Sequence, residues 1–198
     1  MSSVQKLQQW LLVIVLLIPF GSAWADWELD STQSAINFIS IKNDSVGEVH
    51  SFTSLAGSIG ATGKVQIVIN LNSVETLVEV RNERMRGLLF ETVTFPAAQI
   101  TARVDPTMLA AAVDRGVITT SVPVTLALHG QEKTMTIAVV AVGEGDGSLR
   151  VFTPRPVIIN ASDFGLEKGV AALTTIAGLQ SISSAIPVTF DLQFTATP

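Results

Sequence analysis

The 198-residue chain contains no cysteine and no tyrosine, and it has only two histidines. Without cysteine, no disulfide can staple the fold and no thiolate can bind a metal ion. Charged residues make up only 15% of the chain, and 17 acidic residues outnumber 12 basic ones, so the formal net charge is −5. An acidic balance argues against nucleic acid as a partner and against electrostatic docking on anionic membranes.

Long apolar runs are also scarce, and the one present, residues 10–20, follows the single basic residue Lys6. Its length of about 11 residues is short of the roughly 20 that a membrane-spanning helix needs. Small residues, Ala23 and Ala25, stand at positions −3 and −1 of a signal-peptidase site. We therefore expect residues 1–25 to be a signal peptide cleaved after Ala25, with an uncleaved anchor as the alternative.

The predicted mature chain, residues 26–198, has the length of one domain and would be exported to the periplasm. No cysteine follows the predicted cleavage site, so a lipid-anchored lipoprotein is excluded. No second long apolar run exists there, so we expect no transmembrane segment in the mature chain.

Alternation of apolar and polar residues dominates the mature chain, which is typical of half-buried strands. Gly60 and Gly63 predict the turn of a hairpin over residues 60–63. Two prolines in residues 148–160 predict that this strand lies at an edge of the sheet or contains a bulge. About seven or eight strands are expected, in an antiparallel barrel or a sandwich. The alternating runs are residues 34–41, 57–71, 119–130, 133–143, 148–160 and 184–194.

Three segments interrupt this pattern. Residues 106–116 and 167–180 predict short helices, with Gly116 and Gly178 near their C-terminal ends. The third segment, residues 80–96, gathers three arginines in a chain that is otherwise poor in charge. Its spacing predicts an amphipathic helix that lies on the sheet and ends before Pro96.

Arg81 is the unusual residue of this third helix. At 100° per residue, Val78, Met85, Leu88 and Leu89 form one apolar stripe that includes Arg81, with Arg84 at its edge, while Asn82, Glu83 and Arg86 point away. A buried arginine must meet a carboxylate, a carbonyl or a ligand head group. The alternatives are therefore a ligand contact or an ion pair, for example with Glu75, Glu79 or Glu91.

Five sequence blocks together resemble the YceI-like family, the polyisoprenoid-binding family of exported bacterial proteins. The family usually carries Arg-Asp-x-His-Leu-Arg where this chain has Arg81 to Arg86; the outer arginines match, and Asn82 and Arg84 replace the aspartate and the histidine. The blocks are WELDSTQSAINFISIK, FTSLAGSIGATGKVQIVINLNSVET, RNERMRGLLFETVTFP, VTLALHGQEKTMTIAV and NASDFGLEKG, and a hydrophobic strand follows them.

The resemblance implies an all-β domain over residues 26–198: an extended, antiparallel, eight-stranded, lipocalin-like barrel with one to three short helices and a lipid in its interior. An eight-stranded barrel either fills with side chains or holds one small ligand. The inward faces are Val, Ile, Leu, Met and Phe, and the mature chain has only Trp27 and no tyrosine to plug the centre. Each buried CH₂ contributes about 0.8 kcal/mol, so an unbranched or prenyl chain suits such an interior.

We therefore expect an exported protein that binds a long apolar lipid, either a polyisoprenoid or an isoprenoid quinone, with no cofactor, no metal ion and no catalytic residue. Isoprenoid or other long-chain lipid is the expected partner, and a homodimer is left open. The expected ligand-binding residues are Phe38, Ile67, Ile69, Arg81, Met85, Leu89, Val124, Leu126, Ile137 and Phe190.

Two alternatives compete with lipid binding. One is a structural or stress-related interaction protein whose barrel is filled with side chains. The other is a small-substrate enzyme that uses His50, with Glu48 two residues away on the same strand face. The simpler interpretation of His50 and His129 is a surface histidine or one whose hydrogen bonds are satisfied. The sequence has no Gly-x-Ser-x-Gly elbow and no phosphate-binding loop.

Overall fold

The computed structural model describes residues 25–114 and 116–197, so the predicted signal peptide lies almost wholly outside the described residues. Twelve strand segments form one sheet, and all their pairings are antiparallel. The strands are β1 (Ala25–Leu29), β2 (Ala35–Lys42), β3 (Val46–Phe52), β4 (Leu55–Gly60), β5 (Lys64–Asn70), β6 (Val74–Glu75), β7 (Ala97–Arg103), β8 (Val117–Leu128), β9 (Gln131–Gly143), β10 (Leu149–Phe152), β11 (Val157–Asn160) and β12 (Ala185–Ala196).

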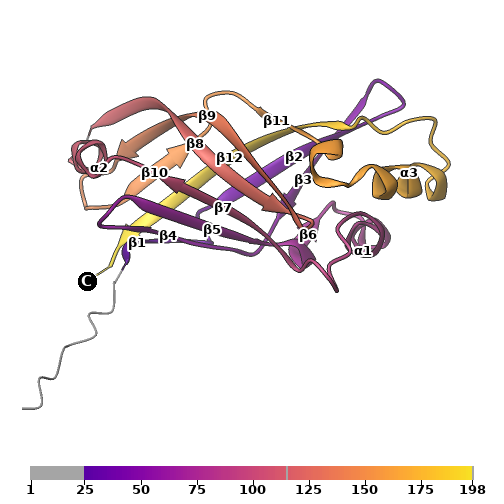
Figure 1. Ribbon diagram of the computed structural model, residues 1–198, viewed down its shortest axis with the longest axis horizontal. Coiled ribbons are helices and arrows are strands. Elements are labelled where there is room, and N and C mark those ends of the chain that lie inside the picture. The colour runs from indigo at the N-terminus through magenta and orange to yellow at the C-terminus, as the bar shows by residue number, and fades with distance from the viewer. Residues whose placement is uncertain (1–24, 115, 198) are drawn as a thin grey trace, which may run out of the picture.

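Short helices join these strands. The α-helices are α1 (Glu79–Arg84), α2 (Pro106–Val113) and α3 (Glu167–Ile176); η2 (Met85–Leu89) is a π-helix, and η1 (Leu71–Ser73) and η3 (Ala161–Phe164) are 3₁₀ turns. Among the described residues, none of the helices is both long enough and apolar enough to cross a bilayer. Figure 1 shows α2 at one end of the elongated sheet and α1 and α3 at the other.

The sheet closes on itself through β1. This short strand pairs with β4 on one side and with β12 on the other, where Leu29 lies opposite Phe194. The closed ring therefore runs β1-β4-β5-β7-β8-β9-β10-β12 and back to β1. The predicted eight-stranded antiparallel barrel is confirmed, and the alternative of a two-layer sandwich is wrong.

Strand β12, with 12 residues, pairs with four other strands. Along one edge it pairs first with β1 and then with β2, where Phe38 lies opposite Val188. Along its other edge it pairs with β10 and then with β11. The break between β10 and β11 contains Pro154 and Pro156, at the position where the sequence predicted an edge or a bulge. Strands β2, β3 and β6 extend the wall toward α1 (Figure 1).

Alternation along the strands decides which side chains face the interior. In β5, Ile67 and Ile69 are buried while Gln66 and Val68 are exposed on the outer face. The predicted hairpin is confirmed as β4 and β5, and its Gly63 has a φ of 74°, a conformation that favours glycine. The predicted helices at 106–116 and 167–180 are confirmed as α2 and α3.

The arginine-rich segment departs from the prediction in its details. The α-helix has only six residues and continues as the π-helix η2, so a constant 100° per residue does not describe it. Met85 is buried as expected, but Leu88 is exposed and Val78 is the exposed N-cap residue. Asn82, predicted to point away from the sheet, is 2% exposed. Its amide is buried because it holds the start of α1, as described below.

Helix α3 and the π-helix η2 pack closely over this end of the barrel. Gly169 of α3 makes the approach possible, because a Cβ there would lie 2.6 Å from the Leu88 carbonyl oxygen and 2.8 Å from the Leu89 Cα. Both obstacles are atoms of the main chain, which cannot move away as a flexible side chain would. The two helices together therefore form a cap whose closure requires glycine at position 169.

We predict that Gly169→Ala forces α3 away from η2 and lowers the free energy of unfolding by about 1–3 kcal/mol, as overpacking does in a tight contact. Gly87→Ala is the matched control, because a Cβ at Gly87 would meet no atom within 4 Å. That variant should unfold at the wild-type denaturant concentration or slightly above it. Urea unfolding of both variants is the measurement, and equal midpoints would contradict the proposed contact.

Candidate functional site

A cavity of about 610 Å³ occupies the interior of the barrel. All strands of the ring except β1 contribute to its wall, and so do α1, α2, η2 and α3. Most of the wall consists of Val, Ile, Leu, Met, Ala and Phe side chains. A barrel filled with side chains is therefore the wrong alternative for this chain, because its interior has room for a ligand of substantial size.

All ten residues expected to bind ligand lie on the wall of this cavity. Nine of them are apolar, and the wall brings together residues that are far apart in the sequence, such as Phe38 of β2 and Phe190 of β12. Alternation placed the seven that lie on strands on inward faces, because none of those strands has a bulge that inverts its faces. Their role as ligand contacts stays a prediction.

At the polar end of the cavity, sequence reasoning named only Arg81 as a ligand contact, and it considered Glu48 and His50 only for the enzyme alternative. Ser40, Lys42, Glu48, His50 and Arg84 also line this end. The sequence did indicate that the four on β2 and β3 face inward. Ser40 and Lys42 follow Phe38 at a spacing of two on β2, and His50 and Glu48 precede Phe52 at the same spacing on β3. Proposing inward positions from apolar residues alone excluded them.

The inward rows of β2 and β3 change from apolar to charged along their length. In the register of the pair, Phe38 lies opposite His50 and Ser40 lies opposite Glu48. Lys42 follows at the end of β2. The cavity thus has an apolar body with a charged end beside β2 and β3, and His50 stands where the two meet. Arg103 and Asp105 also line the cavity, near α2.

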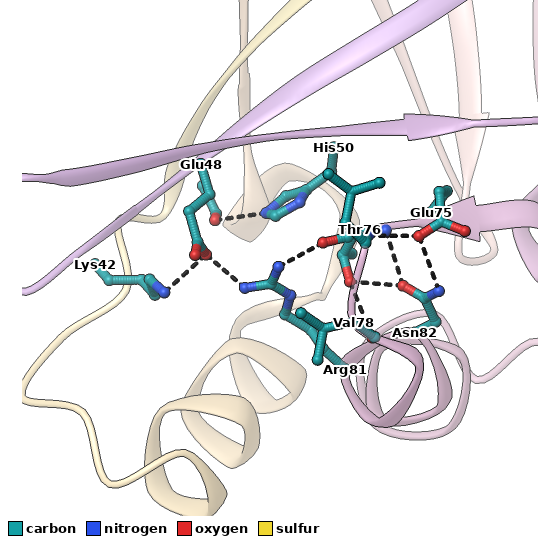
Figure 2. A network of polar contacts seen from close by, with 10 residues as sticks. Lys42, Glu48, His50, Glu75, Thr76, Val78, Arg81 and Asn82 are labelled. Atoms are coloured by element: carbon teal, nitrogen blue, oxygen red, sulfur yellow. Dashed lines mark hydrogen bonds and ion pairs between the residues drawn. The ribbon is translucent and has the colours of Figure 1, made fainter.

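Two cations share one carboxylate at the charged end (Figure 2). The Glu48 carboxylate accepts from Lys42 Nζ at 2.7 Å and from Arg81 at 2.6 Å, and Arg81 also donates to the Thr76 carbonyl oxygen at 2.6 Å. The hydrogen bond from Lys42, helped by the charges of Arg81 and Lys42, lowers the pKa of Glu48 against the opposing effect of burial. An ion pair of Arg81 was expected, but the suggested partners Glu75, Glu79 and Glu91 were wrong. The partner comes from β3, which no local spacing could indicate.

Asn82 fixes the beginning of α1 against the strand end. Its side-chain oxygen accepts from the Thr76 backbone N–H at 2.9 Å and from the Thr76 hydroxyl at 2.6 Å. Its amide nitrogen donates to Glu75 at 3.2 Å and to Glu79 at 3.3 Å (Figure 2 shows the contacts with Thr76 and Glu75). Because Thr76 also accepts from Arg81, the Asn82 network holds the arginine in place at the cavity end.

His50 is 3% exposed and lines the cavity. Its Nε2 is 2.8 Å from the Ser40 hydroxyl, and its ring lies 5.1 Å from the ring of Phe38. Burial, followed by the nearby charge of Arg81, lowers the pKa of His50, so the imidazole is neutral near pH 7. Its Nδ1 is buried and has no hydrogen-bond partner among the described residues. The interpretation as a surface or fully satisfied histidine was wrong for His50.

His129 lies elsewhere, in the turn between β8 and β9, with its Nδ1 3.3 Å from the Phe164 carbonyl oxygen. It packs on Phe95 and does not belong to the cavity wall. Within the described ranges, no group of three or more His, Asp or Glu residues is arranged to hold a metal ion. Polar wall residues therefore gather around His50 and Glu48 at one end of the cavity, and Arg103 and Asp105 lie on the wall near α2.

The sequence profile of the YceI-like domain matches residues 27–194. The chain belongs to the YceI-like family. A comparison with curated protein sequences gave no significant match. Among solved structures, a polyisoprenoid-binding domain from Saccharophagus degradans, described as implicated in plant cell wall breakdown, is 36% identical with a TM-score of 0.85; the match covers 88% of this chain and 100% of that one.

Two more distant structures share the fold. BcnA of Burkholderia cenocepacia is 19% identical with a TM-score of 0.67, over 84% of this chain and 99% of its own. A YceI protein of Campylobacter jejuni is 16% identical with a TM-score of 0.54, over 75% of this chain and 84% of its own. The barrel architecture is thus common to all of them at low sequence identity.

Asn82→Asp should lower the free energy of unfolding by about 1–3 kcal/mol, because it removes a buried donor and sets a third carboxylate beside Glu75 and Glu79. Asn72→Asp makes the same chemical change at an exposed position of η1 and should stay within about 0.5 kcal/mol of wild type. Chemical denaturation of both variants tests this. If both lose the same stability, the buried amide network is not the cause.

We also predict a pH dependence that originates at His50. Its folded-state pKa lies below the ordinary 6.5. The unfolded chain therefore binds more protons than the folded one in acid, and stability falls as the pH drops below about 6.5 toward the folded-state pKa. The charged groups that act on the ring are Lys42, Glu48 and Arg81, and all three remain in a His50→Gln variant.

The measurement is the difference in unfolding free energy between wild type and His50→Gln from about pH 8 to about pH 5, the range in which histidine titrates. Because Glu48, Lys42 and Arg81 are present in both proteins, the difference isolates His50. We expect wild type to lose its advantage as the pH falls. A difference that is constant across this range would mean that the histidine has the same pKa in the folded and unfolded states.

Proposed function

We propose that the mature chain is an exported, periplasmic binding protein that holds a long apolar lipid, a polyisoprenoid or an isoprenoid quinone, inside the barrel. The observation that carries this proposal is the cavity of about 610 Å³ with a wall of mostly aliphatic and phenylalanine side chains. The relative from Saccharophagus degradans, which is a polyisoprenoid-binding domain, supports the same ligand class. The export signal suggested by residues 1–25 supports the location.

The cavity volume limits how much of the lipid is enclosed. An apolar cavity of about 150 Å³ takes up one benzene, or about 25 Å³ per carbon. By that ratio, a volume of about 610 Å³ encloses about 24 carbon atoms, which is the content of nearly five isoprene units. A longer tail would have to leave the barrel at one end or widen it.

A catalytic role for His50 has less support. Ser40 and His50 lie within hydrogen-bond distance, as a nucleophile and its base do. In a serine-histidine-aspartate triad, however, a carboxylate orients the other ring nitrogen. The Nδ1 of His50 has no such partner within the described residues, and the nearest carboxylate, Glu48, is held by Lys42 and Arg81. The site is therefore better suited to binding than to hydrolysis.

The experiment is extraction of the purified protein with organic solvent, before and after incubation with prenyl lipids, followed by mass spectrometry. Val124→Phe places a ring in the cavity, because Val124 is a buried wall residue. If the ring displaces about two buried CH₂ groups, affinity falls about 15-fold at about 0.8 kcal/mol per group. Val68→Phe is the matched control, since Val68 is on the outer face of β5 and 39% exposed.

Retention of a prenyl lipid by wild type and Val68→Phe, with several-fold less in Val124→Phe, would support the proposal. Wild-type protein that stays empty when prenyl lipids are supplied would overturn it. Thermal unfolding of the two variants shows whether a lost lipid reflects a lost fold.

A further inference from the structure

Exposed apolar side chains gather at the end of the barrel that carries α1 and the cap. Leu77 is 90% exposed, Val80 and Ile176 are both 49% exposed, and Val46 and Val78 are exposed as well. We call these five residues the apolar rim. Figure 1 shows α1 and α3, which carry Val80 and Ile176, at the same end of the sheet. Exposed apolar side chains that gather in this way mark a contact with a partner or a membrane.

The apolar rim borders the place where the cavity reaches solvent. Ile176 is half exposed and is also part of the cavity wall. In α1, Val80 directly precedes Arg81, and on the inward row of β3, Val46 precedes Glu48 by two residues. Arg81 and Glu48 both line the cavity and are partly exposed. A chain that leaves the cavity here therefore meets apolar side chains before it meets bulk water.

The opposite end of the cavity has a different border. The exposed wall residues near α2 include the charged Arg103 and Asp105, together with Met108. An apolar surface that surrounds a charged pair is less suited to contact with hydrocarbon. The two ends are therefore not equivalent, and the apolar rim is the better surface for such a contact.

Leu77 is held in its exposed position by a strained turn. Its φ of 62° lies in the left-handed region, which is costly for leucine and favours glycine or asparagine. The turn cannot relax, because Asn82 accepts from the Thr76 backbone N–H and Arg81 donates to the Thr76 carbonyl oxygen (Figure 2). Glu75 accepts from the backbone N–H of Leu77 itself. A fold that maintains strain to keep a leucine in solvent indicates a contact for that side chain outside this domain.

Arg84 adds an unpaired positive charge beside the apolar rim. It lies one turn after Val80 on α1, lines the cavity and is only partly buried. The other two arginines of this segment are in ion pairs, whereas Arg84 has no hydrogen bond or ion pair with any described residue. A guanidinium binds phosphate well, and at a bilayer surface phosphate groups lie directly above the acyl chains.

The overall charge limits which bilayer surfaces fit. The chain has a net charge of −5, and Glu79 and Glu83 are exposed on the same helix as Arg84. General attraction to an anionic surface therefore does not drive the contact. Insertion of apolar side chains, with one arginine on one phosphate, needs no excess of anionic lipid.

We propose that the apolar rim docks on the surface of a lipid bilayer, with Leu77, Val80 and Ile176 among the acyl chains and Arg84 on a lipid phosphate. The cavity then opens toward the bilayer, so that a long apolar lipid moves between the two without crossing bulk water. This inference rests on the proposed function, because a bilayer is where such a lipid is found. Docking itself requires no lipid inside the barrel.

The test is flotation of the purified mature chain with phosphatidylcholine vesicles that contain no prenyl lipid. Wild type should float with the vesicles, and added salt should change this little, because the main contacts are apolar. Leu77→Asn should weaken vesicle binding about tenfold, the effect of keeping one leucine out of an apolar phase. Because asparagine tolerates a positive φ, this variant should unfold at the wild-type denaturant concentration or above it.

Two further variants locate the contact. Arg84→Gln removes the charge and should weaken vesicle binding several-fold, whereas unchanged binding would contradict the phosphate contact. Val117→Asn is the matched control, because Val117 is 67% exposed at the start of β8, close to α2 and far from the apolar rim. It should float as wild type does.

Three results would overturn the inference. The first is wild-type protein that does not float with vesicles. The second is an equal loss of binding in Leu77→Asn and Val117→Asn. The third is a wild type that elutes as a dimer while Leu77→Asn elutes as a monomer, because the rim would then be covered by a second copy of this chain. Protein that floats but stays empty in the extraction experiment would contradict the proposed function and leave docking supported.

Discussion

Closure of the sheet by β1 is the constraint on which the rest of this structure depends. A strand of five residues pairs with β4 on one side and β12 on the other, and it thereby turns an open sheet with two edges into a ring. Once the ring is closed, every inward side chain faces another wall instead of water. The interior is then wider than its side chains can fill, because those side chains are mostly Val, Ile, Leu and Phe, and a cavity of about 610 Å³ remains.

Different helices cover the two ends of the barrel. At one end, α2 lies against β9, where Gly143 allows the carbonyl oxygens of Ala112 and Val113 to approach within 2.1 and 2.4 Å of the position of a Cβ. At the other end, η2 and α3 form the cap, and Glu48 ties the adjoining helix α1 to β3 through Arg81. Because Glu48 and Arg81 are each partly exposed, that ion pair adds modest stability. Its larger effect is to fix where the charged end of the cavity lies relative to its apolar body.

Sequence reasoning predicted the architecture and ten residues of the cavity wall, but little of the polar site. Alternation identifies an inward face from its own strand, so Ile67, Val124 and Ile137 could be placed without tertiary information. Helical periodicity failed for Leu88, because the segment changes from α-helix to π-helix after Arg84. It failed for Asn82 because the Asn82 amide is buried by its bonds to Thr76. His50 was considered only as a catalytic residue or as an ordinary histidine, although its spacing from Phe52 placed it on an inward row of possible ligand contacts. Polar residues on an inward-facing row of a strand indicate a polar binding site, and a search for apolar residues alone overlooks it.

By itself, the sequence determined the all-β class, the inward faces, the hairpin at 60–63 and the family, because each of these follows from local patterns or from blocks along the chain. Only the tertiary structure decided that the interior is hollow, that Arg81 pairs with a carboxylate 33 residues earlier in the chain, and that the Nδ1 of His50 is buried without a partner. The physical reason is the same in each case. Volume, ion pairing and unsatisfied polar atoms depend on distances between strands that are remote in sequence, and those distances exist only after the barrel has closed.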